Sequence, residues 1–237
     1  MSLSVKSKPA APLLVPYWDI LPIRIPTSVS THAGFRAWAT SDAFPEKLRA
    51  SFINQEIVID MSLEELETHN KVKGEVYRVV GGLIRDLDLG ELYCDGTLVT
   101  NVAAGLSTEP DGTFVTWATF EAGRVRLVPR QDRPGQYVEL EGTPDWVLEV
   151  VSRSSVRKDT EWLRQSYHQA GIPEYWLIDA QFDEVSFQVL RRRRDRYVAV
   201  APRGSWYRST VFGRSFRLQR RTNRLGRWAY SLEVAPA

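Results

Sequence analysis

Two stretches of the chain carry apolar residues at helical spacing. In residues 62–90 the apolar positions are Leu66, Val72, Val76, Val79, Val80, Leu83 and Ile84. Ser62 can cap the start of this segment, and Gly90 can end it. Residues 155–170 have a similar character and are followed by Gly171 and Pro173, which stop helices. The pattern therefore predicts a long helix and a shorter one.

Short apolar runs bounded by turn residues predict strands between and after these helices. The expected strands are residues 55–61, 92–94, 98–101, 113–120, 123–128, 145–151 and 174–179, with a hairpin at 185–190 and 197–201. Prolines and glycines make residues 129–143 a predicted loop, and the tail from Gly204 holds short strand-like pieces. Strands interrupted by helices predict an α/β (α+β) fold, a mixed sheet flanked by helices.

The N-terminal part lacks this regularity. Residues 1–26 contain five prolines and little periodicity, which predicts an irregular arm. Residues 27–44 give no clear helical or strand pattern. We therefore expect an arm over residues 1–44 and one domain over residues 45–237.

The composition narrows the class of protein. Among 237 residues there is no run of 18 apolar positions, so we expect no membrane span. No apolar core follows the first lysines, so we expect no signal peptide and, by default, a cytoplasmic location. The single cysteine, Cys94, excludes an internal disulfide and cysteine-rich zinc sites. Three histidines make a histidine-built metal centre a poor expectation.

Charge is divided unevenly along the chain. From Ser186 onward there are thirteen arginines, no lysines and two acids, a net charge of +11. Since the whole chain carries +2, residues 1–185 carry −9. The basic part could bind a polyanion such as nucleic acid, or it could be a solvated surface.

Two carboxylates interrupt apolar strands. Glu149 lies within Trp146–Val151, and Asp111 precedes the strand that begins near Thr113. A buried carboxylate is costly unless it is paired or holds a cation. Two carboxylates on adjacent strands could hold a divalent metal such as magnesium. The alternatives are an arginine partner for Glu149 and a β-turn role for Asp111 in its Pro-Asp-Gly sequence.

The same region resembles a known family. The residues that carry the resemblance are EIVIDMS at 56–62, His69, STEPDGTFV at 107–115, PDWVLEVVSRSS at 144–155, Asp159, Tyr167 and GIPEYWLID at 171–179. They are similar to the putative restriction endonucleases of the Uma type, within the PD-(D/E)XK nuclease superfamily. The resemblance spans about residues 45–200. It implies a restriction-endonuclease-like fold in which Asp111 and Glu149 bind Mg²⁺ or Mn²⁺ and a lysine assists the attacking water.

The chain departs from the family at this lysine. The family position on the second helix is Leu163, and the alternative position on the strand is Val151. Lys158 and Arg164 are the nearest substitutes, and arginine is a poor proton acceptor. A first-motif acid of the family is replaced by Ser51.

Two functions follow from these observations. The first is a magnesium-dependent endonuclease that hydrolyses DNA, with Asp111, Glu149 and Lys158 as catalytic residues. The second is a catalytically impaired nuclease fold that binds nucleic acid or a protein partner. We expect a nucleic acid partner, DNA before RNA, and no membrane; a homodimer stays open.

Overall fold

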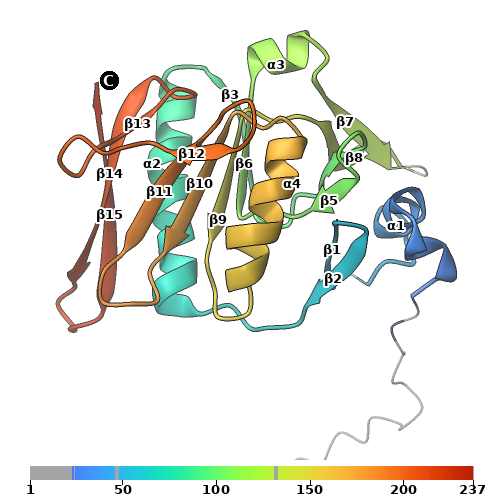
Figure 1. Ribbon diagram of the computed structural model, residues 1–237, viewed down its shortest axis with the longest axis horizontal. Helices are drawn as coiled ribbons and strands as arrows, with labels where there is room; N and C mark the ends of the chain where they lie inside the picture. The colour runs from blue at the N-terminus through green and yellow to red at the C-terminus, as the bar shows by residue number, and fades with distance from the viewer. Residues whose placement is uncertain (1–22, 24, 46–47, 131–132, 237) are drawn as a thin grey trace, which may run out of the picture.

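The computed structural model describes residues 23, 25–45, 48–130 and 133–236 (Figure 1). Most of the predicted arm lies outside these residues, and its boundary at residues 44 and 45 stays a prediction. Within residues 27–44 the chain forms a short 3-10 turn, η1 (Thr27–Ser30), and a helix, α1 (His32–Ala39). Thr31 caps α1 by accepting a hydrogen bond from the Gly34 N–H.

The described residues form three sheets. The central sheet has the order β12-β11-β10-β9-β6-β3. Its strands are β3 (Gly90–Cys94), β6 (Gly112–Thr116), β9 (Trp146–Val150), β10 (Glu174–Asp179), β11 (Ser186–Arg192) and β12 (Tyr197–Ala199). Strands β9 and β10 are parallel, while β6 runs antiparallel to β9. The expected mixed sheet is thus confirmed.

The other two sheets flank the central one. The second sheet, in the order β2-β1-β5-β4-β8-β7, comprises β1 (Arg49–Ile53), β2 (Glu56–Asp60), β4 (Val99–Asn101), β5 (Leu106–Thr108), β7 (Val125–Arg130) and β8 (Arg133–Gly142). The third comprises β13 (Tyr207–Ser209), β14 (Arg214–Thr222) and β15 (Trp228–Pro236). The predicted strand-like pieces of the tail therefore include two strands of nine residues each.

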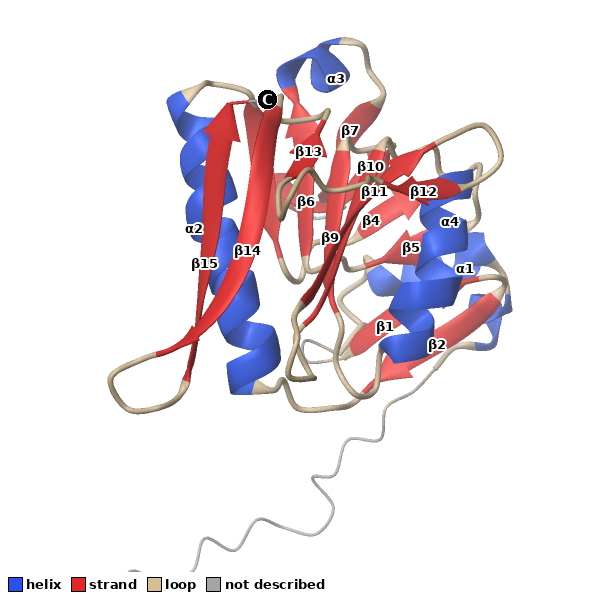
Figure 2. Cartoon of the chain, turned by 60° about the vertical axis from the view of Figure 1, so that its left-hand side comes forward, coloured by secondary structure: helices blue, strands red, loops and turns tan. Residues whose placement is uncertain are grey.

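Helices cover both faces of the central sheet (Figure 2). The first predicted helix is a π-helical turn, η2 (Leu66–Asn70), continued by α2 (Lys71–Asp86). Glu65, not Ser62, provides the cap, because its carboxylate accepts from the Glu67 and Thr68 N–H groups. The second is η3 (Lys158–Trp162) continued by α4 (Leu163–Gln169). No helix in the described part of the chain is long and apolar enough to cross a membrane.

The core lies in two layers, one on each face of the central sheet. Residues of α2 pack with one face, together with β14 and β15; the largest members are Phe114, Trp146, Trp176 and Phe216. Leu163 and Tyr167 pack on the other face. Alternate residues of β9 serve the two layers, as expected for side chains that alternate across a strand.

Two predicted segments are wrong. The strand expected at 113–120 ends at Thr116, and residues 117–121 form a short helix, α3 (Trp117–Glu121), because the Thr116 hydroxyl accepts from the Thr119 N–H. The loop expected at 129–143 contains β8, which pairs with β7 and with β4. Pro129 is accommodated by register shifts in this pairing. The partner strand β4 is distant in sequence, so local composition could not reveal it.

Candidate functional site

Glu149 is placed by the alternation of β9. Trp146, Leu148 and Val150 point into the α2 layer, so Glu149 points to the α4 side. Its side chain is buried, and the Tyr167 hydroxyl of α4 donates to its Oε1 at 2.5 Å. The helix that follows β9 thus returns to hold the strand's one carboxylate. The arginine partner considered from the sequence is absent from the described hydrogen bonds and ion pairs of Glu149.

Asp111 lies beside Glu149 on the neighbouring strand. The antiparallel register pairs Gly112 with Leu148, and one further step places Asp111 opposite Glu149. Opposed residues of antiparallel strands have Cβ atoms about 5 Å apart and share a face. Asp111 Oδ2 accepts from the Val150 N–H at 2.7 Å. Gly112 permits this approach, since a Cβ there would lie 3.3 Å from the Trp146 ring.

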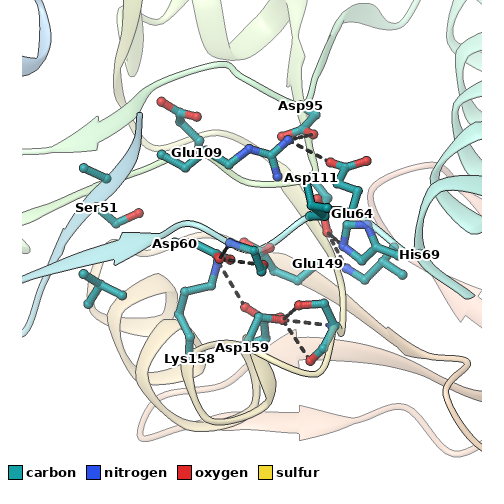
Figure 3. A pocket seen from close by; sticks show the side chains of 18 residues that line it. Ser51, Asp60, Glu64, His69, Asp95, Glu109, Asp111, Glu149, Lys158 and Asp159 are labelled. Carbon is teal, nitrogen blue, oxygen red and sulfur yellow. Dashed lines mark hydrogen bonds and ion pairs between the residues drawn. The ribbon is translucent and has the colours of Figure 1, made fainter. Parts of the chain in front are cut away.

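Lys158 also lines the pocket that Asp111 and Glu149 line (Figure 3). It is the first residue of η3, just after the turn that follows β9. Its Nζ lies 3.5 Å from Oδ1 of buried Asp159. The Ser155 hydroxyl donates to the other oxygen of Asp159 at 2.5 Å. The structure therefore brings all three predicted site residues to one pocket.

The position of the family lysine and its second substitute both lie away from the pocket. Leu163 is fully buried in the apolar layer between the helix and the sheet. Arg164 points elsewhere, because it donates to the Tyr197 carbonyl at 3.4 Å and lines a separate hollow beside α4. Of the two cations considered from the sequence, only Lys158 lines the pocket.

The pocket is rich in carboxylates. Its described lining residues include seven acids, namely Asp60, Glu64, Asp95, Glu109, Asp111, Glu149 and Asp159. The cations among them are Arg49 and Lys158, with His69 also present. Ser51, where the family acid is missing, lines the pocket too and shares a 3.0 Å hydrogen bond with the Thr108 hydroxyl. The lining is therefore strongly acidic even without an acid at position 51.

Burial and like charges shift the acids of this pocket. Burial, followed by the charge of Asp159, raises the pKa of Glu149 well above its ordinary value. Burial raises the pKa of Asp159 to about 6. Burial by itself would raise the pKa of Asp111 too, but His69, Lys73 and the Val150 N–H lower it. The pair opposite each other is thus unlike: one carboxylate favours ionisation and the other resists it.

Lys158 has the complementary shift. Burial by itself would lower the pKa of its ammonium, but the charges of Glu149 and Asp159 raise it above its ordinary value. Lys158 is therefore charged at neutral pH. It can donate hydrogen bonds to an anion, and it is a poor proton acceptor.

Sequence reasoning missed several residues of the site. His69 Nε2 lies 3.5 Å from Asp111 Oδ2, so the histidine that forms part of the family resemblance contacts the site. Lys73 lies one helical turn later, with Nζ 3.4 Å from Asp111 Oδ1. The spacing of four between these residues on an amphipathic helix was a usable signal. Glu64 and Asp95 join the cluster through long-range contacts, which no local pattern reveals.

Other residues of the motifs are structural. Asp145, the acid of the Pro-Asp pair before β9, accepts from the Thr116 N–H and the Thr119 hydroxyl. Buried Glu174 accepts from the Trp176 indole and from the Thr210 N–H, so it ties β10 to the segment after β13. The Tyr175 hydroxyl donates to the Asp159 carbonyl. These contacts fix the strands and the helix that carry the site.

Carboxylate oxygens are the ligands that magnesium and manganese prefer. Even so, no group of three or more His, Cys, Asp or Glu side chains within the described residues has an arrangement suited to holding a metal ion. An ion at the Asp111–Glu149 pair would need further ligands from water or substrate, which is usual for magnesium.

Comparisons with known proteins identify the family. The crystal structure of a putative nuclease belonging to DUF820 from Anabaena variabilis ATCC 29413 is similar to 69% of this chain and 82% of its own chain, with 17% identity and a TM-score of 0.48. No curated protein matches the sequence. The profile of the Uma2 family, described as putative restriction endonuclease, matches residues 33–219. This match covers most of the chain, which therefore belongs to the Uma2 family.

Proposed function

We propose that this protein is a magnesium- or manganese-dependent endonuclease that hydrolyses DNA phosphodiester bonds. Asp111 and Glu149 hold the metal ion, and Lys158 stabilises the negative charge of the reacting phosphate. The observation that carries the proposal is the meeting of two opposed strand carboxylates and a buried ammonium at one acidic pocket. Membership of a family of putative restriction endonucleases supports it.

The residues present fit a hard divalent cation. Burial and neighbouring carboxylates raise the pKa of Glu149 and of Asp159, which is the signature of too much negative charge in one place. A cation beside Asp111 and Glu149 would relieve this repulsion. When bound, such an ion lowers the pKa of water and neutralises charge on a phosphoryl oxygen.

The side chains of the pocket then have separable roles. Lys158 stays protonated and can donate to a non-bridging phosphate oxygen, which gains negative charge in the transition state. The Tyr167 hydroxyl fixes the orientation of Glu149. The Val150 N–H and His69 fix that of Asp111. None of these four groups has to move for the carboxylates to face the pocket.

Calorimetry with Mn²⁺ and cleavage of supercoiled plasmid DNA test the proposal together. Asp111→Asn and Glu149→Gln should abolish Mn²⁺ binding and lower the cleavage rate by about 100-fold or more. Glu121→Gln, an exposed acid on α3, serves as the control and should match wild type. Unchanged Mn²⁺ binding in Glu149→Gln would refute the site.

The alternative is a nuclease fold that binds nucleic acid without cleaving it. The leucine at position 163 and the serine at 51 favour it, because both replace charged groups of the family. Lys158 in the pocket favours the enzyme. Wild-type protein that binds Mn²⁺ and DNA but cleaves no plasmid with either metal would decide for the alternative.

A further inference from the structure

Lys73 is a buried lysine that the proposed chemistry does not use. It lies on α2, and its side chain is 4% exposed. Its Nζ lies 2.6 Å from Glu64 Oε1, 2.8 Å from Asp95 Oδ2 and 3.4 Å from Asp111 Oδ1. A buried ammonium is held this way only where carboxylates compensate its lost hydration.

The three carboxylates come from separate parts of the fold. Glu64 lies between β2 and η2, Asp95 follows β3, and Asp111 precedes β6. Their convergence on one buried point is the oxygen-only donor set that suits a hard divalent cation. In this chain the point is filled by an ammonium fixed to a helix. Arg49 supports the same cluster, 2.9 Å from Glu64 and 3.7 Å from Asp95.

The position matters because Asp111 belongs to both groups. Lys73 approaches its Oδ1, while His69 and the Val150 N–H approach its Oδ2. On the proposed function, Asp111 also shares an ion with Glu149. Asp111 therefore stands between that ion and the lysine, in the place where a carboxylate would bridge two metals.

We propose that Lys73 is a built-in cation that occupies a second divalent-ion position beside Asp111 and limits the site to one exchangeable metal ion. The charge-assisted bonds to Glu64 and Asp95 hold the ammonium there. A second ion would have to displace a buried side chain and leave its charge unpaired, which is strongly unfavourable. The inference rests on the proposed function for the first ion.

The stoichiometry of Mn²⁺ binding tests this inference without relying on cleavage. Calorimetry with Mn²⁺ should give one ion for wild type and two for Lys73→Met, because methionine keeps the volume of the side chain and removes the charge. Lys73→Arg, which keeps the charge, should bind one ion. Two ions in wild type, or one ion in folded Lys73→Met, would overturn the inference.

A second variant covers the case in which Lys73→Met does not fold by circular dichroism. Glu64→Gln keeps Lys73 in place and weakens only the cluster around it. It should bind one Mn²⁺ with an affinity within about threefold of wild type, since a peripheral change of this kind leaves the first ion's ligands intact. Loss of a bound ion in this variant would show that the cluster itself holds exchangeable metal.

Failure of the proposed function gives a different result. If wild type binds no Mn²⁺, the assignment of Asp111 and Glu149 as metal ligands is wrong. The inference about Lys73 then stands only if Lys73→Met gains one ion relative to wild type, and it falls if nothing is gained.

Discussion

Glu149 and Asp159 show how burial sets the charge of a single residue. Both are almost completely enclosed, at 2% and 1% exposure, and both have raised pKa values. Each also has one oxygen held by a hydroxyl, from Tyr167 and from Ser155 respectively. The hydroxyls fix the geometry of the carboxylates without adding positive charge, so the need for a cation remains.

Tyr167→Phe should weaken the site without dismantling it. The change removes the hydroxyl that orients Glu149, and removing such a supporting hydrogen bond lowers metal affinity or activity by about 10- to 100-fold. Mn²⁺ calorimetry and plasmid cleavage measure the two effects. Tyr175→Phe is the matched control, because this equally buried tyrosine donates to a main-chain carbonyl and not to Glu149. Equal losses in both variants would argue for general destabilisation.

Asp159 should make metal-free protein less stable as pH rises. Its pKa is about 6 when folded against about 3.9 in an unfolded chain, so the folded state binds more protons between these values. The free energy of unfolding therefore falls as pH rises from 4 to 7, by on the order of 2 kcal/mol from this group.

Urea denaturation in EDTA measures this dependence. Asp159→Asn removes the titrating group and should flatten the fall between pH 4 and 7 relative to wild type. The comparison between variants is needed because Asp111 and Glu64, with lowered pKa values, contribute the opposite slope at lower pH. Identical slopes in wild type and Asp159→Asn would contradict the prediction.

At the scale of elements, β9 and the helix that follows it form one unit. The strand ends at Val150, a turn of serines leads to η3, and α4 returns to the sheet before β10. Asp159, Leu163 and Tyr167 recur at spacing four, so they share the face turned toward β9. Two of the three contact the carboxylate groups of the site or their neighbours, and Leu163 lies buried between them.

This geometry predicts that the ammonium can be relocated along the helix. Lys158→Ala should lower plasmid cleavage by about 100-fold, because the buried charge beside the phosphate is removed. Adding Leu163→Lys to that variant should restore part of the rate, since position 163 faces the same strand. Leu163→Met in the Lys158→Ala background is the control for the change in packing. A double variant no better than this control would mean that position 163 cannot present its charge to the pocket.

At the scale of the whole molecule, much of the basic C-terminal part is committed to structure. Arg191 donates to the Arg208 carbonyl and Arg192 to the His168 carbonyl. Arg217 and Arg220 stack over the rings of Trp206 and Trp228. The net charge of +11 therefore overstates what this part can offer to a polyanion. The exposed arginines of the β11–β12 hairpin, Arg193, Arg194 and Arg196, are the better candidates.

The hairpin lies at the opposite end of the sheet from the pocket. Arg191 pairs with Glu174 at the start of β10, whereas the pocket lies at the end of the parallel strand β9. Six residues of strand span about 20 Å, so only an extended nucleic acid could reach both regions. This arrangement makes the hairpin a contact for flanking DNA, away from the reacting phosphate.

Neutralising Arg193 and Arg194 to glutamine should therefore weaken DNA binding in a salt-dependent way. The slope of log affinity against log salt should become shallower by about one unit for each phosphate that the variant no longer neutralises. Fluorescence anisotropy with a labelled duplex of about 30 base pairs, on the order of three helical turns, measures the slope. Arg85→Gln on α2 is the control. An unaltered slope would identify the hairpin arginines as a solvated surface.

The sequence by itself determined the elements whose residues carry local signals. Apolar periodicity predicted the two long helices and most strands of the central sheet, and the strand contexts of Asp111 and Glu149 marked them as candidates. Lys158 followed from its closeness in sequence to the same motif. These predictions succeeded because each depends on residues within one turn or one strand of each other.

Only the tertiary structure decided the rest. Strand β8 forms because β4 and β7 lie beside it, and β14 and β15 form because they pair along nine residues. The acidic pocket brings Glu64 and Asp95 to Lys73 from three separate elements. Burial there shifts the pKa of the acids, and a group's burial depends on all of the chain that surrounds it. Such contacts have no local pattern, so the charge and the partners of this site could come only from the folded molecule.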